Sequence, residues 1–176
     1  IGVGLIGASI ALAARRAGLA ASVTGCEIDS AKAGEIEKLG LVDHVTTDAV
    51  AAVQDADLVV MAVPVGALGP LAAQIVPAMK PGAVITDTGS TKRSVLRDVD
   101  PHISGDIHWI PSHPLAGTEH SGPAAGFAEL FDGRYWLVLP REVPDDKVVR
   151  FESFVTGMGS VSERMDADYH DKVLAL

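Results

Sequence analysis

A short polar segment, residues 112–122, carries the side chains best suited to chemistry. It reads Ser-His-Pro-Leu-Ala-Gly-Thr-Glu-His-Ser-Gly, which brings hydroxyls, two imidazoles and a carboxylate together. Its proline and glycine content predicts a loop, and loops on a rigid scaffold commonly hold reactive groups. His113 is the candidate base, because an imidazole with a pKa of about 6.5 accepts a proton at neutral pH. Glu119 could tune or gate that imidazole.

His113 stands directly before Pro114, which biases its backbone toward an extended conformation. Gly117 and Gly122 allow the chain to fold around a ligand. A single histidine is more often structural than catalytic, so these residues alone leave both roles open. The six histidines and one cysteine show no spacing typical of a zinc site, and we expect no bound metal.

A glycine motif lies at residues 2–7, which read Gly-Val-Gly-Leu-Ile-Gly. In this pattern Gly2 permits a tight turn, Gly4 lets the backbone approach a pyrophosphate, and Gly7 allows a helix to pack closely on a strand. Small residues could instead serve helix packing alone. The order of strand, turn, helix and a later acidic residue favours dinucleotide binding.

The predicted nucleotide site includes the start of the following helix. Leu5 and Ile6 belong to the glycine turn directly before that helix, where the positive end of the helix dipole faces the phosphates. Glu27 lies about 20 residues past the motif, after a predicted strand, where a carboxylate accepts the ribose hydroxyls. Glu27 and Asp29 would repel the additional phosphate of NADP. The sequence therefore predicts NAD as the cofactor, in preference to NADP.

Two further segments follow predicted strands, and ligands of open α/β sheets bind where strands end. Val63 and Pro64 form a backbone edge against which the nicotinamide ribose could lie, although a plain loop explains them nearly as well. Residues 86–92 read Thr-Asp-Thr-Gly-Ser-Thr-Lys and place Ser90 among polar groups. Ser90 or Thr91 could equally cap the helix that follows.

The alternation of strands and helices predicts an α/β fold with a doubly wound, mostly parallel sheet. The expected strands are 22–26, 58–63, 83–86, 106–110, 135–139 and 160–164, after the end of a first strand at Ile1. The expected helices are 8–17, 30–39 with Ser30 as N-cap, 68–79, 92–98, 145–158 and one from Ala167 onward.

Composition limits the partners that the chain could bind. Its 176 residues carry a net charge of −9 and are 48% hydrophobic, which fits a globular protein without the basic clusters that nucleic acids require. The longest apolar run, residues 58–65, is far shorter than the ~18 residues of a membrane span. A single cysteine excludes an intrachain disulfide and fits a reducing cytoplasm. We expect a cytoplasmic protein with a small-molecule substrate, and neither nucleic acid nor membrane as a partner.

Several motifs together resemble the prephenate dehydrogenase family, which includes arogenate and cyclohexadienyl dehydrogenases. They lie at residues 2–9, 62–64, 86–92, 112–122 and 130–134, in that order. The His-Pro-Leu-Ala-Gly-Thr-Glu block after Gly-Ser-Thr-Lys is far more specific than the glycine motif. The resemblance implies NAD(P)-dependent oxidative decarboxylation of prephenate to 4-hydroxyphenylpyruvate, or of arogenate to tyrosine, in tyrosine biosynthesis.

The resemblance also implies roles for individual residues. His113 takes the place of the family's catalytic histidine, and Ser90 that of a serine which touches both the substrate hydroxyl and the cofactor. Glu119 matches an acidic residue implicated in gating the site. Thr118 and His170 are expected to bind the substrate together with Ser90 and His113, and His170 and Asp171 match the His-Asp pair that opens the family's helical domain.

The resemblance divides the chain into a dinucleotide-binding domain, residues 1–165, with a truncated first strand, and the start of a helical domain, residues 166–176. In the family, that helical domain supplies the substrate-binding arginine and the dimer contact. We therefore expect the protein to form a homodimer through it, and these 176 residues alone to bind NAD without turnover.

Two other functions remain open at this point. One is an NAD-dependent dehydrogenase of the β-hydroxyacid type, which shares a glycine turn and a strand-proline segment but usually employs a catalytic lysine. The other is a non-catalytic NAD-sensing module, which needs no base beside the nicotinamide.

Overall fold

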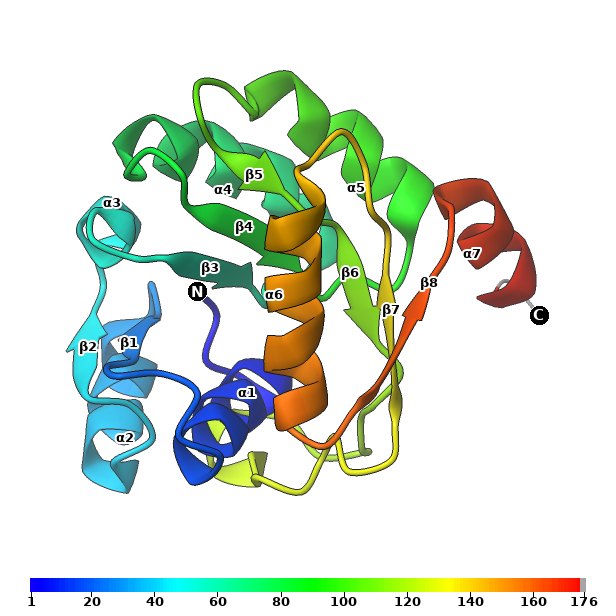
Figure 1. The fold of residues 1–176 in the computed structure, drawn as a ribbon. Coiled ribbons are helices and arrows are strands. Elements are labelled where there is room, and N and C mark those ends of the chain that lie inside the picture. Colours follow the sequence, from blue (N-terminus) through cyan, green and yellow to red (C-terminus); the bar gives the residue numbers. More distant parts are fainter. Residues whose placement is uncertain (175–176) are drawn as a thin grey trace.

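The computed structural model describes residues 1–174 and has an α/β architecture (Figure 1). Its strands are β1 (Thr24–Cys26), β2 (His44–Thr46), β3 (Leu58–Met61), β4 (Val84–Asp87), β5 (His108–Trp109), β6 (Ser112–Pro114), β7 (Tyr135–Val138) and β8 (Val161–Arg164). Its α-helices are α1 (Leu5–Arg16), α2 (Ser30–Leu39), α3 (Ala49–Val53), α4 (Leu68–Ile75), α5 (Lys92–Val99), α6 (Asp145–Gly157) and α7 (Ala167–Leu174).

The strands form three small sheets that are mostly parallel. β1 pairs with β2, and β4 lies between β3 and β5, all with parallel register. β7 pairs antiparallel with β6 and parallel with β8. The predicted class, an α/β fold with a doubly wound and mostly parallel sheet, is confirmed.

The side chains of β3 show how two cores form on opposite faces. Val59 and Met61 belong to an apolar cluster with α4 and α5, whereas Leu58 and Val60 contact a second cluster that includes α1 and α6. Figure 1 shows α6 in front of the strands and α4 and α5 behind them. Successive side chains of a strand point to opposite faces, so a strand covered on both sides has a continuous apolar sequence.

The ends of two helices differ from the sequence prediction, and capping explains one of them. Asp29, rather than Ser30, is the N-cap of α2, because its carboxylate accepts hydrogen bonds from the backbone amides of Ala31 and Lys32 at 2.9 and 3.2 Å. α1 begins at Leu5, three residues earlier than predicted, with Gly4 as its N-cap. The glycine motif therefore runs directly into the helix.

Other differences come from short elements and from proline. The predicted helix 68–79 is α-helical only to Ile75 and continues as a 3₁₀ turn, Val76–Ala78, which contains a proline that lacks an amide donor. β2 and α3 were not predicted, since each has five residues or fewer. The predicted loop at 112–122 begins with a strand, β6, so His113 has the extended backbone expected before Pro114. Helix α7 is confirmed through Leu174, and its predicted extension to residue 176 lies outside the described residues.

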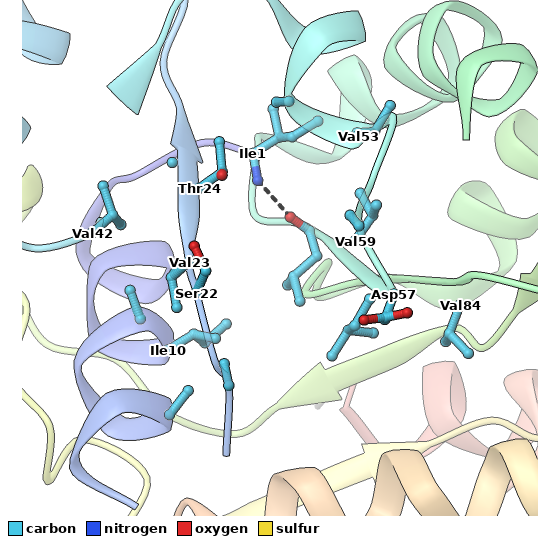
Figure 2. A pocket seen from close by; sticks show the side chains of 18 of the residues that line it. Ile1, Ile10, Ser22, Val23, Thr24, Val42, Val53, Asp57, Val59 and Val84 are labelled. Carbon is cyan, nitrogen blue, oxygen red and sulfur yellow. Dashed lines mark hydrogen bonds between the residues drawn. The ribbon is translucent and has the colours of Figure 1, made fainter. Parts of the chain in front are cut away.

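A large cavity of about 850 Å³ lies between β1 and β3 (Figure 2). Ile1 and Gly2 connect the two strands, because the Ile1 amine donates to the Val60 carbonyl at 2.7 Å and the Gly2 amide donates to the Cys26 carbonyl at 2.9 Å. The cavity is lined mainly by aliphatic side chains and backbone, and none of the predicted catalytic residues lines it. We therefore place the chemistry elsewhere, at the carboxyl ends of the strands.

Among residues 1–174, no helix combines the length and apolar character needed to cross a membrane. Within the same residues, His, Cys, Asp and Glu side chains do not gather in a group that could hold a metal ion.

Candidate active site

A cleft of about 320 Å³ is lined by segments that follow three different strands. Parallel strands direct their carboxyl ends to one edge of a sheet, and ligands of such sheets bind at that edge. The cleft is lined by Ile6, Val63, Pro64, Val65, Thr88, Gly89, Ser90, His113, Pro114 and Ala116. Three separately predicted segments, 62–66, 86–92 and 112–122, therefore meet there, together with the start of α1.

The three glycines of the motif differ in what surrounds them. Gly2 has a φ of +81°, and a Cβ there would lie 2.6 Å from the Ala62 carbonyl oxygen. A Cβ at Gly7 would overlap the carbonyl oxygen of Gly2. Gly2 and Gly7 are therefore required by the fold itself, as the tight turn and the close helix packing predicted for them.

Gly4 is the one glycine of the motif whose surroundings do not require it. A Cβ at Gly4 would meet no atom within 4 Å, although the residue is the N-cap of α1. No side chain caps this helix and its first turn carries no acidic residue, so the amides at its N-terminus remain free for an anion. These features fit the pyrophosphate of a dinucleotide, with Leu5 and Ile6 at the first turn of the helix.

Glu27 follows β1 directly and is partly exposed at the same edge of the fold. Its carboxylate accepts one hydrogen bond, from the Asp29 amide at 3.3 Å, and otherwise has no hydrogen-bond partner among the described residues. The Asp29 carboxylate is instead occupied in capping α2. Glu27 is therefore the carboxylate that is available to ribose hydroxyls.

His113 lies on β6 and contributes to the cleft wall while remaining partly buried. Its Nδ1 lies 3.0 Å from Nε2 of His170, whose Nδ1 lies 2.7 Å from Oδ1 of Asp171. Burial, the Lys92 ammonium and the neighbouring His170 lower the pKa of His113 from 6.5 to about 4, and Asp171 opposes them. His113 is consequently neutral at pH 7 and able to accept a proton.

Asp171 connects α7 to the N-terminus of α5. Its two carboxylate oxygens accept hydrogen bonds from the backbone amides of Lys92 at 2.7 Å and Arg93 at 2.9 Å. Burial raises the pKa of the Asp171 carboxyl, but these amides and the His170 imidazole outweigh it and hold that pKa below its usual value. Thr91 is the N-cap residue of α5, but its hydroxyl bonds the Ser94 hydroxyl at 2.8 Å and no backbone amide, so the alternative of a hydroxyl cap at Ser90 or Thr91 is wrong.

A buried ion pair lies behind the cleft, and the sequence analysis gave it no role. Nζ of Lys92 lies 2.5 Å from Oδ2 of Asp87 and 2.5 Å from the carbonyl oxygen of Ser112, and all three residues are fully buried. Asp87 also accepts hydrogen bonds from the amides of Gly89 and Ser112. Burial raises the pKa of Asp87 and lowers that of Lys92, while their mutual attraction opposes both shifts. The pair joins the end of β4 to the residue before His113.

The remaining predicted site residues occupy different positions around the cleft. Ser90 lines it and is exposed, in agreement with a ligand-facing role. Thr118 and Glu119 are exposed and lie outside its lining, and Oε1 of Glu119 lies 3.6 Å from Nε2 of His120. His170 is fully buried behind His113 and is not a lining residue, so the prediction that it contacts substrate is not supported by its position.

The motif at residues 130–134 has a structural explanation. Leu130 and Phe131 are buried in the core that α1 and α6 share. Asp132 accepts a hydrogen bond from the Arg16 guanidinium at 2.8 Å, which fastens this segment to the end of α1. The segment thus supports the helix whose N-terminus faces the cleft.

A doubly wound sheet, an open glycine turn and a neutral histidine at the strand ends define the nucleotide-binding domain of a dehydrogenase. The sequence model described as "Prephenate dehydrogenase, nucleotide-binding domain" matches residues 10–164, and the chain belongs to this family. Membership of this family excludes the alternative of a β-hydroxyacid-type dehydrogenase, which the residues alone had left open.

Individual relatives agree with this assignment. The chain is 40% identical to the cyclohexadienyl dehydrogenase of Zymomonas mobilis over all of its own length and 60% of that protein. It superimposes with a TM-score of 0.91 and 28% identity on prephenate dehydrogenase from A. aeolicus in complex with hydroxyphenyl propionate and NAD+, covering 99% of this chain and 61% of that one. Synechocystis arogenate dehydrogenase matches with a TM-score of 0.90 and 25% identity, over 99% and 61% of the two chains. The chain thus spans less than two thirds of the length of these proteins.

Proposed function

We propose that this protein is an NAD-dependent dehydrogenase that oxidatively decarboxylates prephenate or arogenate in tyrosine biosynthesis. The observation that carries the proposal is the position of His113, which lines the cleft with a lowered pKa in a chain of the prephenate dehydrogenase family. The names of the relatives, which include both prephenate and arogenate dehydrogenases, support this substrate class.

The proposed reaction requires the protein to supply a base at the substrate hydroxyl. The ring carbinol carbon of the substrate loses a hydride and its hydroxyl loses a proton, which gives a ring ketone. The bond to the ring carboxylate then breaks, carbon dioxide leaves, and its electron pair makes the ring aromatic as the ketone oxygen takes up a proton. A single base at the hydroxyl, correctly aligned, can take that proton and return it.

His113 is the group that we assign to this proton transfer. Because its Nδ1 is engaged by His170, Nε2 is the ring nitrogen left for the substrate hydroxyl. Ser90 lines the same cleft and is assigned to orient that hydroxyl toward His113. We assign Glu119 to gating and Thr118 to the substrate entrance, since both are exposed on the segment that continues from β6.

NAD, when bound, supplies the acceptor for the hydride. We assign the pyrophosphate to Gly4 and the amides of the first turn of α1, and the adenine-side ribose to Glu27. Val63 and Pro64 are assigned to the nicotinamide end, because they line the cleft that contains His113. The preference for NAD over NADP follows from the free carboxylate of Glu27, which would repel a phosphate on the ribose.

The finer features of the assembly are also proposals. We infer that residues 1–165 form the dinucleotide-binding domain, with a helical region beginning at 166, whose described part is α7. The relatives are longer than this chain, and we propose that a further region carries the substrate-binding arginine and the contact of a homodimer, as the family resemblance implies. We further propose that the protein acts in the cytoplasm, which suits its single buried cysteine, and that residues 1–176 alone do not turn over substrate.

The test is an assay of the intact protein with prephenate and arogenate, each with NAD and NADP, followed by the absorbance of the reduced cofactor. We expect turnover of at least one substrate, and a His113→Asn variant that binds NAD normally but loses about 100-fold or more in kcat. No turnover of either substrate would refute the assigned reaction. Unchanged cellular function of the His113→Asn variant would instead favour an NAD-sensing module.

A further inference from the structure

Three side chains from two distant parts of the sequence form a continuous chain of hydrogen bonds. His113 Nδ1 lies 3.0 Å from His170 Nε2, and His170 Nδ1 lies 2.7 Å from Asp171 Oδ1. The rings of His113 and His170 are tilted by 56° with centroids 5.2 Å apart, so they meet through nitrogen atoms rather than by stacking. His170 is fully buried, which keeps water from replacing either contact.

The direction of each hydrogen bond follows from the Asp171 end. The Asp171 carboxylate already accepts from the amides of Lys92 and Arg93, and its lowered pKa keeps it ionised, so it can only accept from His170. His170 Nδ1 therefore carries hydrogen. In the neutral form of His170, which has one donor and one acceptor, Nε2 accepts and His113 Nδ1 donates. His113 is left with an unprotonated Nε2.

We propose that His170 and Asp171 are positioning residues that hold His113 in the tautomer whose Nε2 is free to act as the base. Helix α7, which carries both residues, thereby contributes to the site although it lies outside the sheet. The catalytic consequence rests on the proposed function, whereas the tautomer of His113 does not depend on it.

The charged groups around His113 agree with this arrangement. Lys92 approaches from α5, while His170 and Asp171 approach from α7. The Lys92 ammonium is held in place by Asp87 and Ser112, and it disfavours a proton on His113. The carboxylate of Asp171 is one imidazole away, so it orients His113 without lying in contact with it. The surroundings thus favour a neutral His113 whose free nitrogen is set by hydrogen bonding.

Asp171 also makes the arrangement depend on the docking of α7. The same carboxylate that orders His170 caps α5, which begins two residues after Ser90. A displacement of α7 would therefore remove the partner of His113 and uncap the helix beside Ser90 together. This one carboxylate therefore bonds both the partner of His113 and the helix that begins two residues after Ser90.

The first experiment measures the tautomer directly by ¹⁵N NMR of the histidine side chains in the intact protein at pH 7, without substrate. We expect His113 to show a protonated Nδ1 and an unprotonated Nε2. A His170→Phe variant, which keeps a ring but removes both nitrogens, should give a mixture of the two tautomers. A protonated Nε2 on His113 in the parent protein would overturn the proposal, whatever reaction the protein catalyses.

The second experiment measures kcat and KM with the preferred substrate. His170→Gln keeps one donor and one acceptor and should retain kcat within about tenfold, while His170→Phe should lose about 100-fold with little change in KM. Tyr169→Phe, an exposed neighbour on α7, is the matched control and should match the parent. Asp171→Asn provides a second route if His170→Phe fails to fold, and it should lower kcat and broaden the tautomer signal of His113. Equal kcat values for the Phe and Gln variants, or an Asp171→Asn protein that behaves as the parent, would contradict a positioning role.

Discussion

The ammonium of Lys92 lies 2.5 Å from the Asp87 carboxylate, and both side chains are fully excluded from solvent. Removing one partner of such a pair leaves an uncompensated buried charge, which is far more costly than the net gain from forming the pair. The same ammonium holds the Ser112 carbonyl, so the pair also fixes the backbone that leads into His113.

We expect Lys92→Met to destabilise the protein by about 3–5 kcal/mol, because Asp87 would remain buried without its cation. Urea unfolding monitored by tryptophan fluorescence measures the effect. In the Lys92→Met/Asp87→Asn double variant, part of that stability should return, so the cycle should show a coupling energy of at least about 1 kcal/mol. A Lys92→Met protein as stable as the parent would show that the pair is dispensable.

The two outer glycines and the middle glycine of the motif should respond differently to the same substitution. Gly7→Ala should destabilise the fold by about 2 kcal/mol or more, because the new methyl group overlaps the Gly2 carbonyl oxygen. Gly4→Ala has free space and should cost less than about 1 kcal/mol, as a weaker N-cap. Its effect should appear in binding instead, with NAD affinity reduced about tenfold or more by the methyl group at the phosphate site.

Thermal unfolding without ligand and NAD titration by calorimetry separate these two effects. Because the Gly4→Ala protein should remain folded, a loss of NAD affinity in this variant can be attributed to the binding site. NAD binding by Gly4→Ala with the affinity of the parent would remove Gly4 from the cofactor site.

Glu27 and Asp29 provide a similarly matched comparison for cofactor choice. Glu27→Ala should weaken NAD use and improve NADP use, shifting the ratio of their kcat/KM values by about tenfold or more, since it removes the carboxylate that we assign to the ribose. Asp29→Asn removes the second charge but keeps a good N-cap for α2, so it should shift the ratio less. Steady-state kinetics with both cofactors measure the change, and a parent protein that uses NADP as well as NAD would contradict the assignment.

The sequence predicts the order of strands and helices well, because their apolar runs and glycine stops are local signals. It also predicts that segments 62–66, 86–92 and 112–122 belong to one site, since each follows a strand and strand ends share an edge. Short elements such as β2 and α3 escape prediction because three to five residues carry little periodicity.

The contacts within the site could not be read from the sequence. Asp171 caps α5 from 79 positions away, whereas local hydroxyls at Ser90 and Thr91 offered a plausible but incorrect cap. Lys92 could be seen as a polar residue of the motif, but its complete burial depends on the packing of β4 and β6 around it. Only the adjacency of His170 and Asp171 hinted at their pairing, and nothing in the sequence joins His170 to His113.

The lowered pKa of His113 predicts how the stability of the protein varies with pH. The unfolded chain binds a proton on this imidazole below about pH 6.5, whereas the folded protein does so only near pH 4. Between these values the unfolded state holds more protons, so the contribution of His113 is fully present above pH 6.5 and is lost as the pH falls toward 4. The loss amounts to at most about 1.4 kcal/mol for each pH unit within that window.

Urea unfolding at intervals from pH 7 to pH 4 measures this slope, and His113→Asn supplies the comparison because it removes the titrating group while keeping a polar side chain. We expect the free energy of unfolding of the parent to fall more steeply than that of the variant, and the two curves to run parallel above pH 7. Asp171 adds a loss of stability only at still more acidic pH, because the lowered pKa of its carboxyl in the folded protein means that its contribution is lost below the usual range for an aspartate. Identical slopes for parent and variant between pH 6.5 and 4 would mean that His113 titrates normally in the folded protein, and its place beside Lys92 and His170 would then have no effect on its charge.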